Sequence, residues 1–186
     1  MRTEAETMTA EAYIQYELKS ERRHEYINGT LFEMPGEKRT NNKIAGALYI
    51  LLTQLLEQQG YQIYSHDMKV AIPGDNKYYY PDVFVTNEPE SEENLYIIYK
   101  PSLIVEVVSE SSHKHDYVDK YIDYTQIPSL EYYIIAEPET VFITVHEREG
   151  DDWTTHQYTK QESIIELPKL NASLPVAEIY KNILPA

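Results

Sequence analysis

Apolar residues recur at helical spacing between Lys43 and Gln59, three and four positions apart along the chain. The set comprises Ile44, Ala47, Leu48, Leu51, Leu52, Leu55 and Leu56. Gly60 follows directly, and glycine is the commonest residue at a helix C-terminus. The pattern predicts a long amphipathic helix. The segment TAEAYIQYELKSE, residues 9–21, predicts a shorter helix before it.

Alternating apolar and polar positions predict the strands. The segment HEYINGTLFEM, residues 24–34, holds two short runs around Asn28-Gly29, the dipeptide that best fits a tight type I′ turn, and so predicts a hairpin. Further strands are expected at residues 61–72, 78–86, 101–109, 130–138 and 140–149, with a helix from Ser111 or Ser112 to about Gln126. The tail is expected to extend the sheet through strands 153–159 and 163–167 and a helix at 175–184.

These elements give a core in the order αβββαβ, which is typical of an α/β fold with a mixed central sheet. An N-terminal helix and hairpin precede this core, and a β/α extension follows it. The chain has 186 residues and no internal repeat or long Pro/Gly/Ser linker. We therefore expect one domain, residues 1–186, around one hydrophobic core.

Charge and composition limit the classes of function. The formal net charge of −15 argues against polyanion binding over the whole surface, so any contact with nucleic acid is expected to be local. The basic residues available for such a contact are Arg22, Arg23, Lys38, Arg39 and Lys43. The absence of cysteine excludes a disulfide, a thiolate metal site and a cysteine nucleophile. No apolar run reaches the roughly 20 residues of a membrane span, and the expected location is the cytoplasm.

Two strands that are otherwise apolar each carry one carboxylate. Asp82 follows Pro81 in YYYPDVFVT, and Glu106 lies in PSLIVEVVS, where it shares a strand face with Ile104 and Val108. A buried charge without a partner costs several kcal/mol, so each carboxylate needs a counter-charge. A divalent cation held by both is one solution. The alternatives are a simple turn at Pro81-Asp82 and an ion pair between Glu106 and a lysine or arginine of a neighbouring element.

Lys120 is the cation best placed to complement Glu106. At about 100° per residue, the helix after the Glu106 strand has an apolar stripe, bordered by Lys120, and a solvent side. The predicted stripe holds Tyr117, Val118, Tyr121, Ile122 and Tyr124, and the predicted solvent side holds Asp119 and Asp123. The lysine is expected to lay its stem on the core and its ammonium beside Glu106. A surface ion pair with Asp116 is the alternative.

The order of motifs resembles the Uma-two family of endonucleases, a branch of the PD-(D/E)XK nuclease superfamily. The motifs are RRHEYINGTLFEM, the long helix, YPDVFVT and the stretch from Pro101 to Pro138. The resemblance covers roughly residues 9–145 and is strongest from Pro81 to Pro138. It implies a restriction-endonuclease-like core and a nuclease activity.

The resemblance also implies roles for four side chains. Asp82 matches the aspartate of the "PD" element, Glu106 the acidic residue of the next strand, and Glu25 the glutamate of the early hairpin. In the parent motif the lysine lies two residues after the acid, where this chain has Val108. Lys120 on the following helix matches the lysine that this branch has moved.

There are departures from the family pattern. The family commonly has a histidine at the start of the long helix, and this chain has Asn41-Asn42 before Lys43. The role of that histidine is therefore absent or moved. The chain has histidines elsewhere. We assign no role to five of them and expect each to lie on the surface or in a loop. They are His66, His113, His115, His146 and His156.

The implied mechanism is a metal-dependent cut of a DNA phosphodiester bond. The side chains of Asp82, Glu106 and Glu25 and the backbone carbonyl of Val107 would hold Mg²⁺ or Mn²⁺. Lys120 would orient the attacking water. A homodimer is expected by analogy with the superfamily. Two alternatives stay open: a catalytically silent module of the same fold for binding or assembly, and a phosphohydrolase acting on nucleotides.

Overall fold

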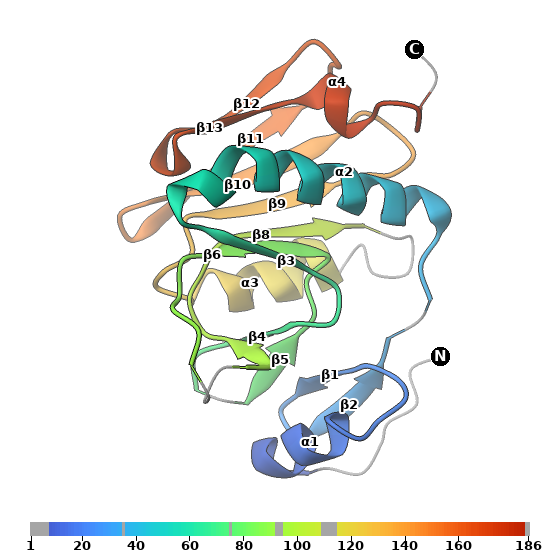
Figure 1. Ribbon diagram of the computed structural model, residues 1–186, viewed down its shortest axis with the longest axis vertical. Coiled ribbons are helices and arrows are strands. Elements are labelled where there is room, and N and C mark those ends of the chain that lie inside the picture. Colours follow the sequence, from blue (N-terminus) through green and yellow to red (C-terminus); the bar gives the residue numbers. More distant parts are fainter. Residues whose placement is uncertain (1–7, 35, 75, 92–94, 109–114, 185–186) are drawn as a thin grey trace.

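A six-stranded mixed sheet forms the centre of the molecule (Figure 1), seen in a computed structural model that describes residues 8–34, 36–74, 76–91, 95–108 and 115–184. Its strands in sheet order are β11 (Asp152–Tyr158), β10 (Ile143–Glu149), β9 (Tyr132–Ala136), β8 (Pro101–Val107), β6 (Val83–Thr86) and β3 (Gln62–Ser65). The β8–β9 pair is parallel, and the remaining neighbours are antiparallel. The prediction of a mixed central sheet is confirmed.

A second sheet of five strands lies below the first in Figure 1. Its order is β2 (Thr30–Glu33), β1 (His24–Ile27), β5 (Lys77–Tyr79), β4 (Lys69–Ala71) and β7 (Ile97–Ile98). The predicted hairpin is its β1–β2 edge. Asn28 and Gly29 both have positive φ, at 49° and 90°, as a type I′ turn requires. This sheet carries Glu25 and reaches the first sheet through the β5–β6 and β3–β4 connections.

Helices cover both faces of the six-stranded sheet (Figure 1). In chain order, the helices of the described residues are α1 (Ala10–Glu17), α2 (Arg39–Leu56), α3 (Tyr121–Tyr124) and α4 (Val176–Ile179). The shorter helical turns are the 3₁₀ turn η1 (Glu57–Gln59) after α2, the π-helical turn η2 (His115–Lys120) before α3, and η3 (Pro168–Leu170). The long helix begins at Arg39, four residues before the predicted start, so Asn41 and Asn42 lie inside it. Gly60 ends it with φ 86°. In the described part of the chain, no helix is long and apolar enough to cross a membrane.

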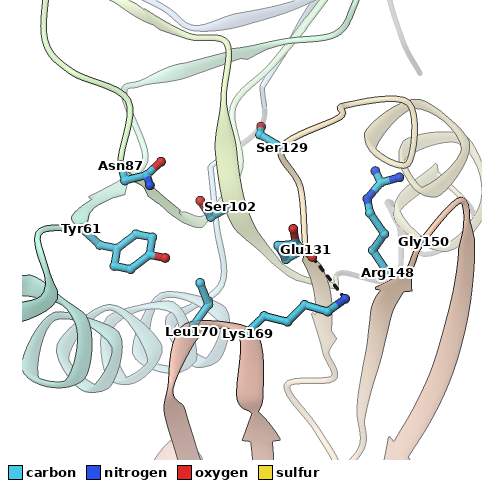
Figure 2. Close-up of a pocket in the computed structure, with 9 residues that line it drawn as sticks. All are labelled: Tyr61, Asn87, Ser102, Ser129, Glu131, Arg148, Gly150, Lys169 and Leu170. Carbon is cyan, nitrogen blue, oxygen red and sulfur yellow. Dashed lines mark ion pairs between the residues drawn. The ribbon is translucent and has the colours of Figure 1, made fainter.

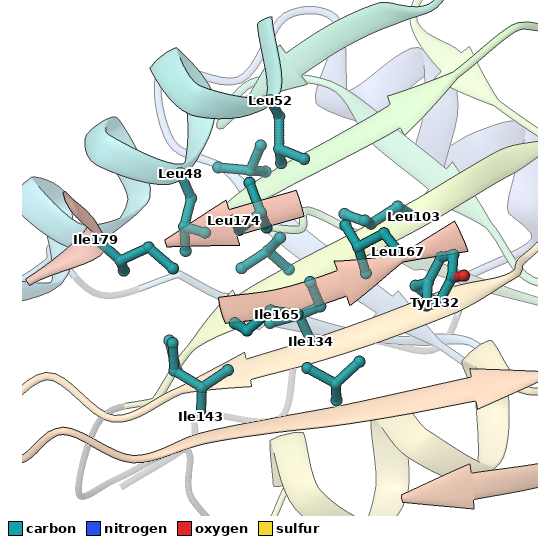
Figure 3. Packing of buried hydrophobic residues seen from close by; sticks show 14 of the residues in the cluster. Leu48, Leu52, Leu103, Tyr132, Ile134, Ile143, Ile165, Leu167, Leu174 and Ile179 are labelled. Carbon is teal, nitrogen blue, oxygen red and sulfur yellow. The ribbon is translucent and has the colours of Figure 1, made fainter. Parts of the chain in front are cut away.

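The main core lies between α2, the sheet and a C-terminal hairpin. That hairpin pairs β12 (Ile164–Leu167) with β13 (Ala172–Pro175) as a separate two-stranded sheet. Figure 3 shows Leu48 and Leu52 of α2 facing Leu103 of β8, with Leu174 between them and the sheet. All four side chains are fully buried. Burial of each contributes about 1.5–3 kcal/mol, which exceeds any helix propensity term.

Three features of the predicted architecture are wrong. The strand 61–72 is split into β3 and β4, and the strand 78–86 into β5 and β6, each half belonging to a different sheet. His66, with φ 59°, breaks the first, and Pro81, which lacks an N–H for the ladder, breaks the second. In the tail, only β11 extends the central sheet; β12 pairs with β13, and the expected helix 175–184 forms only at Val176–Ile179.

Candidate active site

Lys120 lies between two carboxylates that come from different sheets. Its Nζ donates to Oε1 of Glu106 on β8 at 2.9 Å and lies 3.1 Å from Oε1 of Glu25 on β1. All three side chains are at least 89 % buried. The ion-pair alternative for Glu106 is therefore present in the structure. The side chain of Asp116, the alternative partner of Lys120, lies outside the described residues.

A π-helical turn aims Lys120 at the sheet. Residues His115–Lys120 are wound with the wider i→i+5 repeat, which is common at functional sites and changes which residues share a face. The stripe predicted at 100° per residue is therefore wrong in part. Val118 and Ile122 are 45 % and 55 % exposed, while Asp123 is buried and accepts from Lys77 Nζ and the Tyr79 hydroxyl at 2.5 and 2.6 Å.

Tyr124 adds a second donor to Glu106. Its hydroxyl donates to the same Oε1 atom at 2.8 Å, and its side chain is fully buried. Burial raises the pKa of Tyr124, with the nearby charge of Glu106 as a further cause, so the hydroxyl remains protonated. Glu106 is therefore held by an ammonium and a hydroxyl, the partners that a buried carboxylate requires.

Asp82 lies directly before β6, beside the end of β8. Val83 of β6 is the antiparallel partner of Val105 of β8. One residue beyond this pair, Asp82 lies opposite Glu106, so the backbones of the two acidic residues are neighbours. The N–H of Val107 donates to Oδ2 of Asp82 at 2.6 Å. Burial raises the pKa of Asp82 well above its ordinary value, and the adjacent carboxyl of Glu37 raises it further.

Asn41 secures the end of β8 from the α2 side. Its side chain is buried, and its Nδ2 donates to the carbonyls of Val107 and Val108 at 3.3 and 3.2 Å. The Val107 carbonyl, predicted as a metal ligand, therefore already accepts one bond. A carbonyl oxygen has two lone pairs, so a second interaction at that atom is still available.

A cavity of about 500 Å³ opens at Asp82. Its wall brings together charges of both signs. The charged or titratable residues that line it are Arg22, Arg23, Glu33, Glu37, His66, Asp67 and Asp82. Two of the five basic residues singled out from the sequence thus lie here, with Arg22 paired to Glu33 and Arg23 to Asp67. Lys38 is on the surface and pairs with Glu139.

The donor set at this cavity fits a divalent ion. Single ligand atoms of Glu37, His66 and Asp82 all lie within 4.8 Å of one another. Glu106 is not a member of this trio, and its Oε1 atom accepts from Lys120 and Tyr124. The sequence-predicted residues therefore come together as two adjoining groups. Asp82 faces the cavity, and Glu106, Lys120 and Glu25 form a buried cluster behind it.

A second cavity, of about 550 Å³, lies at the other end of β8 (Figure 2). Ser102 and Glu131 line it from the starts of β8 and β9, and Lys169 reaches over it to pair with Glu131. The Arg148 guanidinium donates to three backbone carbonyls. Its charged groups are thus satisfied within the fold, and none of the predicted site residues lines it.

Comparison with known proteins agrees with the geometry. Residues 10–177 match the model of the Uma2 family, described as "Putative restriction endonuclease". The chain belongs to the Uma2 family. Two Synechocystis proteins, the uncharacterized proteins slr1290 and sll1609, are each 29 % identical to it over 177 and 162 residues. These alignments cover 95 % and 86 % of this chain and 93 % and 92 % of the two relatives.

The crystal structure of a "putative nuclease belonging to DUF820" from Anabaena variabilis superposes on this chain with a TM-score of 0.78. The match covers 95 % of this chain and 99 % of the other at 13 % identity, which shows the fold alone. The predicted restriction-endonuclease-like α/β fold is confirmed. The descriptions of the Uma2 family and of its structural neighbour both suggest a nuclease.

Sequence reasoning missed four side chains at this site. Glu37 and His66 lie in connections between elements, where no periodicity marks a position, and Asn41 was expected before the helix rather than inside it. Tyr124 was placed in the apolar stripe, yet its hydroxyl bonds Glu106. One signal was available for His66: it separates two short β-like runs, and a residue at such a break sits near a strand end.

Proposed function

We propose that this Uma2 protein is a divalent-metal-dependent endonuclease that hydrolyses phosphodiester bonds in DNA. The observation that carries the proposal is the convergence of Lys120, Glu106 and Glu25 directly behind Asp82. Lys120 lies on a helix and Glu25 on a separate sheet, so no local motif accounts for the cluster. Family membership supports the same chemistry.

Asp82 and Glu106, with the Val107 carbonyl, would hold Mg²⁺ or Mn²⁺. When bound, the ion would polarise the scissile phosphate and lower the pKa of a water ligand. Asp82 is pre-positioned for this role, since the Val107 N–H fixes one of its oxygens and the residue lines the cavity. Arg22 and Arg23 on the cavity wall would contact the phosphates that flank the cut.

Lys120 would orient the attacking water and stabilise charge on the phosphate. Its ammonium is buried and paired with Glu106 and Glu25, and these two contacts fix its direction. Glu25 would act through Lys120 by setting its position. Such preorganised charge commonly contributes 10²–10³ in rate, of order 3–4 kcal/mol.

The experiment is a panel of substrates with purified protein and Mg²⁺ or Mn²⁺. Plasmid, single-stranded DNA and free nucleotides are incubated with wild type, Asp82→Ala and Glu106→Ala. The proposal expects nicking of plasmid that both substitutions abolish. Hydrolysis of nucleotides alone would instead show a phosphohydrolase, and absence of any Asp82-dependent activity or ion binding would show a silent module. Equal nicking by wild type and variants would mean a contaminant.

A further inference from the structure

Three chain segments that are far apart in the sequence meet at the cavity beside Asp82. Glu37 comes from the connection before α2, His66 from the β3–β4 break, and Asp82 from the start of β6. Their ligand atoms lie within 4.8 Å of one another. Glu37 and His66 are exposed, whereas Asp82 is nine-tenths buried. Two solvent-exposed ligands thus face one buried ligand, an arrangement open to an ion that enters from solvent.

The free side of Asp82 calls for a cation. One of its oxygens accepts from Val107, and among the described residues the other meets no N–H donor and forms no ion pair. Its neighbour there is the carboxyl of Glu37. The two carboxyl groups lie within hydrogen-bonding reach of each other, and they repel when both are ionised. A metal ion between them removes that repulsion.

His66 adopts a positive φ, which is uncommon in residues other than glycine, although asparagine, aspartate and histidine adopt it more often than the rest. Its φ of 59° lies in the left-handed region, and its N–H points to the carbonyl of Asp82 at 3.4 Å. The turn therefore brings the imidazole to the same residue that supplies the carboxylate. Imidazole nitrogen suits first-row transition metals, while Mg²⁺ prefers oxygen ligands only.

We propose that His66 is a nitrogen ligand of the ion at Asp82, with Glu37 as a further oxygen ligand, and that the site therefore favours Mn²⁺ over Mg²⁺. This inference rests on the proposed function for its ion at Asp82. It adds the identity of two ligands and a metal preference.

The test is pulsed electron paramagnetic resonance of Mn²⁺ bound to the full chain, with no substrate added. Wild type should show ¹⁴N coupling from a directly bound imidazole. His66→Asn should lose that coupling and bind Mn²⁺ about 10-fold or more weakly, while its Mg²⁺ affinity changes less than about twofold. Asparagine tolerates a positive φ, so this variant keeps the turn. His156→Asn, on exposed strand β11, is the matched control and should keep the coupling.

The outcomes separate this inference from the proposed function. Two results would show that His66 is not a ligand and would leave the endonuclease proposal standing. One is Mn²⁺ binding that needs Asp82 but shows no ¹⁴N coupling, and the other is coupling that survives in His66→Asn. Mn²⁺ and Mg²⁺ binding that is the same in Asp82→Ala as in wild type overturns both. Glu37→Gln should lower the affinity for both Mn²⁺ and Mg²⁺, and unchanged affinities would show that Glu37 is not a ligand.

Discussion

Glu106 is a buried carboxylate whose partners fix its direction. Lys120 and Tyr124 both donate to its Oε1 atom. The lysine supplies charge and the tyrosine supplies geometry, because a neutral hydroxyl at 2.8 Å restricts the rotation of the carboxylate. In the proposed site, where this carboxylate would also bind an ion at the end of β8, such restriction would favour binding.

Tyr124→Phe should therefore affect activity more than stability. Loss of the hydroxyl costs about 1 kcal/mol in the free energy of unfolding, because the Lys120 bond remains. Nicking should fall about 10-fold at saturating Mn²⁺. Denaturant unfolding and single-turnover cleavage measure the two effects. Tyr133→Phe, another buried tyrosine on the same side of the sheet, serves as a control for ring packing. An equal loss of activity in the control would make the Tyr124 effect purely structural.

His146, expected on the surface or in a loop, lies instead in strand β10 with its ring partly buried, and it gives the fold a defined sensitivity to acid. Burial lowers its pKa to about 4, from an ordinary 6.5, and its buried Nε2 atom has no hydrogen-bond partner among the described residues. The folded state therefore keeps the ring neutral. The unfolded chain takes up the proton first, so the contribution to stability is complete above about pH 6.5 and is lost as the pH falls towards 4.

His146→Phe should retain the ring packing against Tyr121 and Tyr133 and remove this titration. We expect the free energy of unfolding to fall less between pH 7 and pH 4.5 in the variant than in wild type. Urea unfolding at a series of pH values measures the difference. Parallel curves for the two proteins would show that His146 does not contribute to the acid sensitivity.

At the scale of elements, helix α1 is fastened to the site's scaffold by Glu17. This buried carboxylate accepts from the backbone N–H and the ring of His24 and from the Tyr80 hydroxyl. His24 adjoins Glu25 on β1, and Tyr80 lies two residues before Asp82. One side chain of α1 thus joins the strand that carries Glu25 to the connection that carries Asp82.

Glu17→Ala should destabilise the fold by about 2–4 kcal/mol, because it leaves buried donors without an acceptor. Glu11→Ala, an exposed change in the same helix, should leave the stability close to that of wild type. Differential scanning calorimetry compares the two. Similar small shifts for both variants would mean that the Glu17 network contributes little to stability.

The sequence predicted element types well and connections poorly. Periodicity located α2 and the face shared by Ile104, Glu106 and Val108, because buried faces impose a regular repeat. It could not show that the strand around His66 bends into a second sheet, since that depends on pairing between distant segments. Nor could it show that Asp123 is buried, because the standard helical angle was assumed and the π-helical turn before Asp123 changes which residues share a face.

At the scale of the whole molecule, the site sits in a strongly acidic protein. The net charge of −15 repels a polyanion, so binding of duplex DNA must depend on a few local contacts. Arg22 and Arg23 are the cations on the wall of the Asp82 cavity, and their side chains are 71 % and 39 % exposed. The expected homodimer and the single-domain organisation remain predictions at this scale.

The salt dependence of DNA binding should accordingly be shallow. Each phosphate contact contributes about −0.9 to the slope of log K against log salt concentration. The double variant Arg22→Ala with Arg23→Ala should reduce the slope by about 2. The exposed pair Lys160→Ala with Lys181→Ala is the control and should leave it unchanged. Fluorescence anisotropy with a labelled duplex, repeated over a series of salt concentrations, measures the slope for wild type and the two double variants. Equal slopes in all three proteins would show that Arg22 and Arg23 do not contact the DNA.

The central claim is that Asp82 and Glu106 form a metal-dependent cutting site with Lys120. The most direct measurement is the rate of plasmid nicking in Mn²⁺ by wild type, Asp82→Asn, Glu106→Gln and the exposed control Glu162→Gln. We predict that the first two substitutions each lower the rate by about 100-fold or more and that the control does not. Nicking by Asp82→Asn or Glu106→Gln at the wild-type rate would contradict the claim.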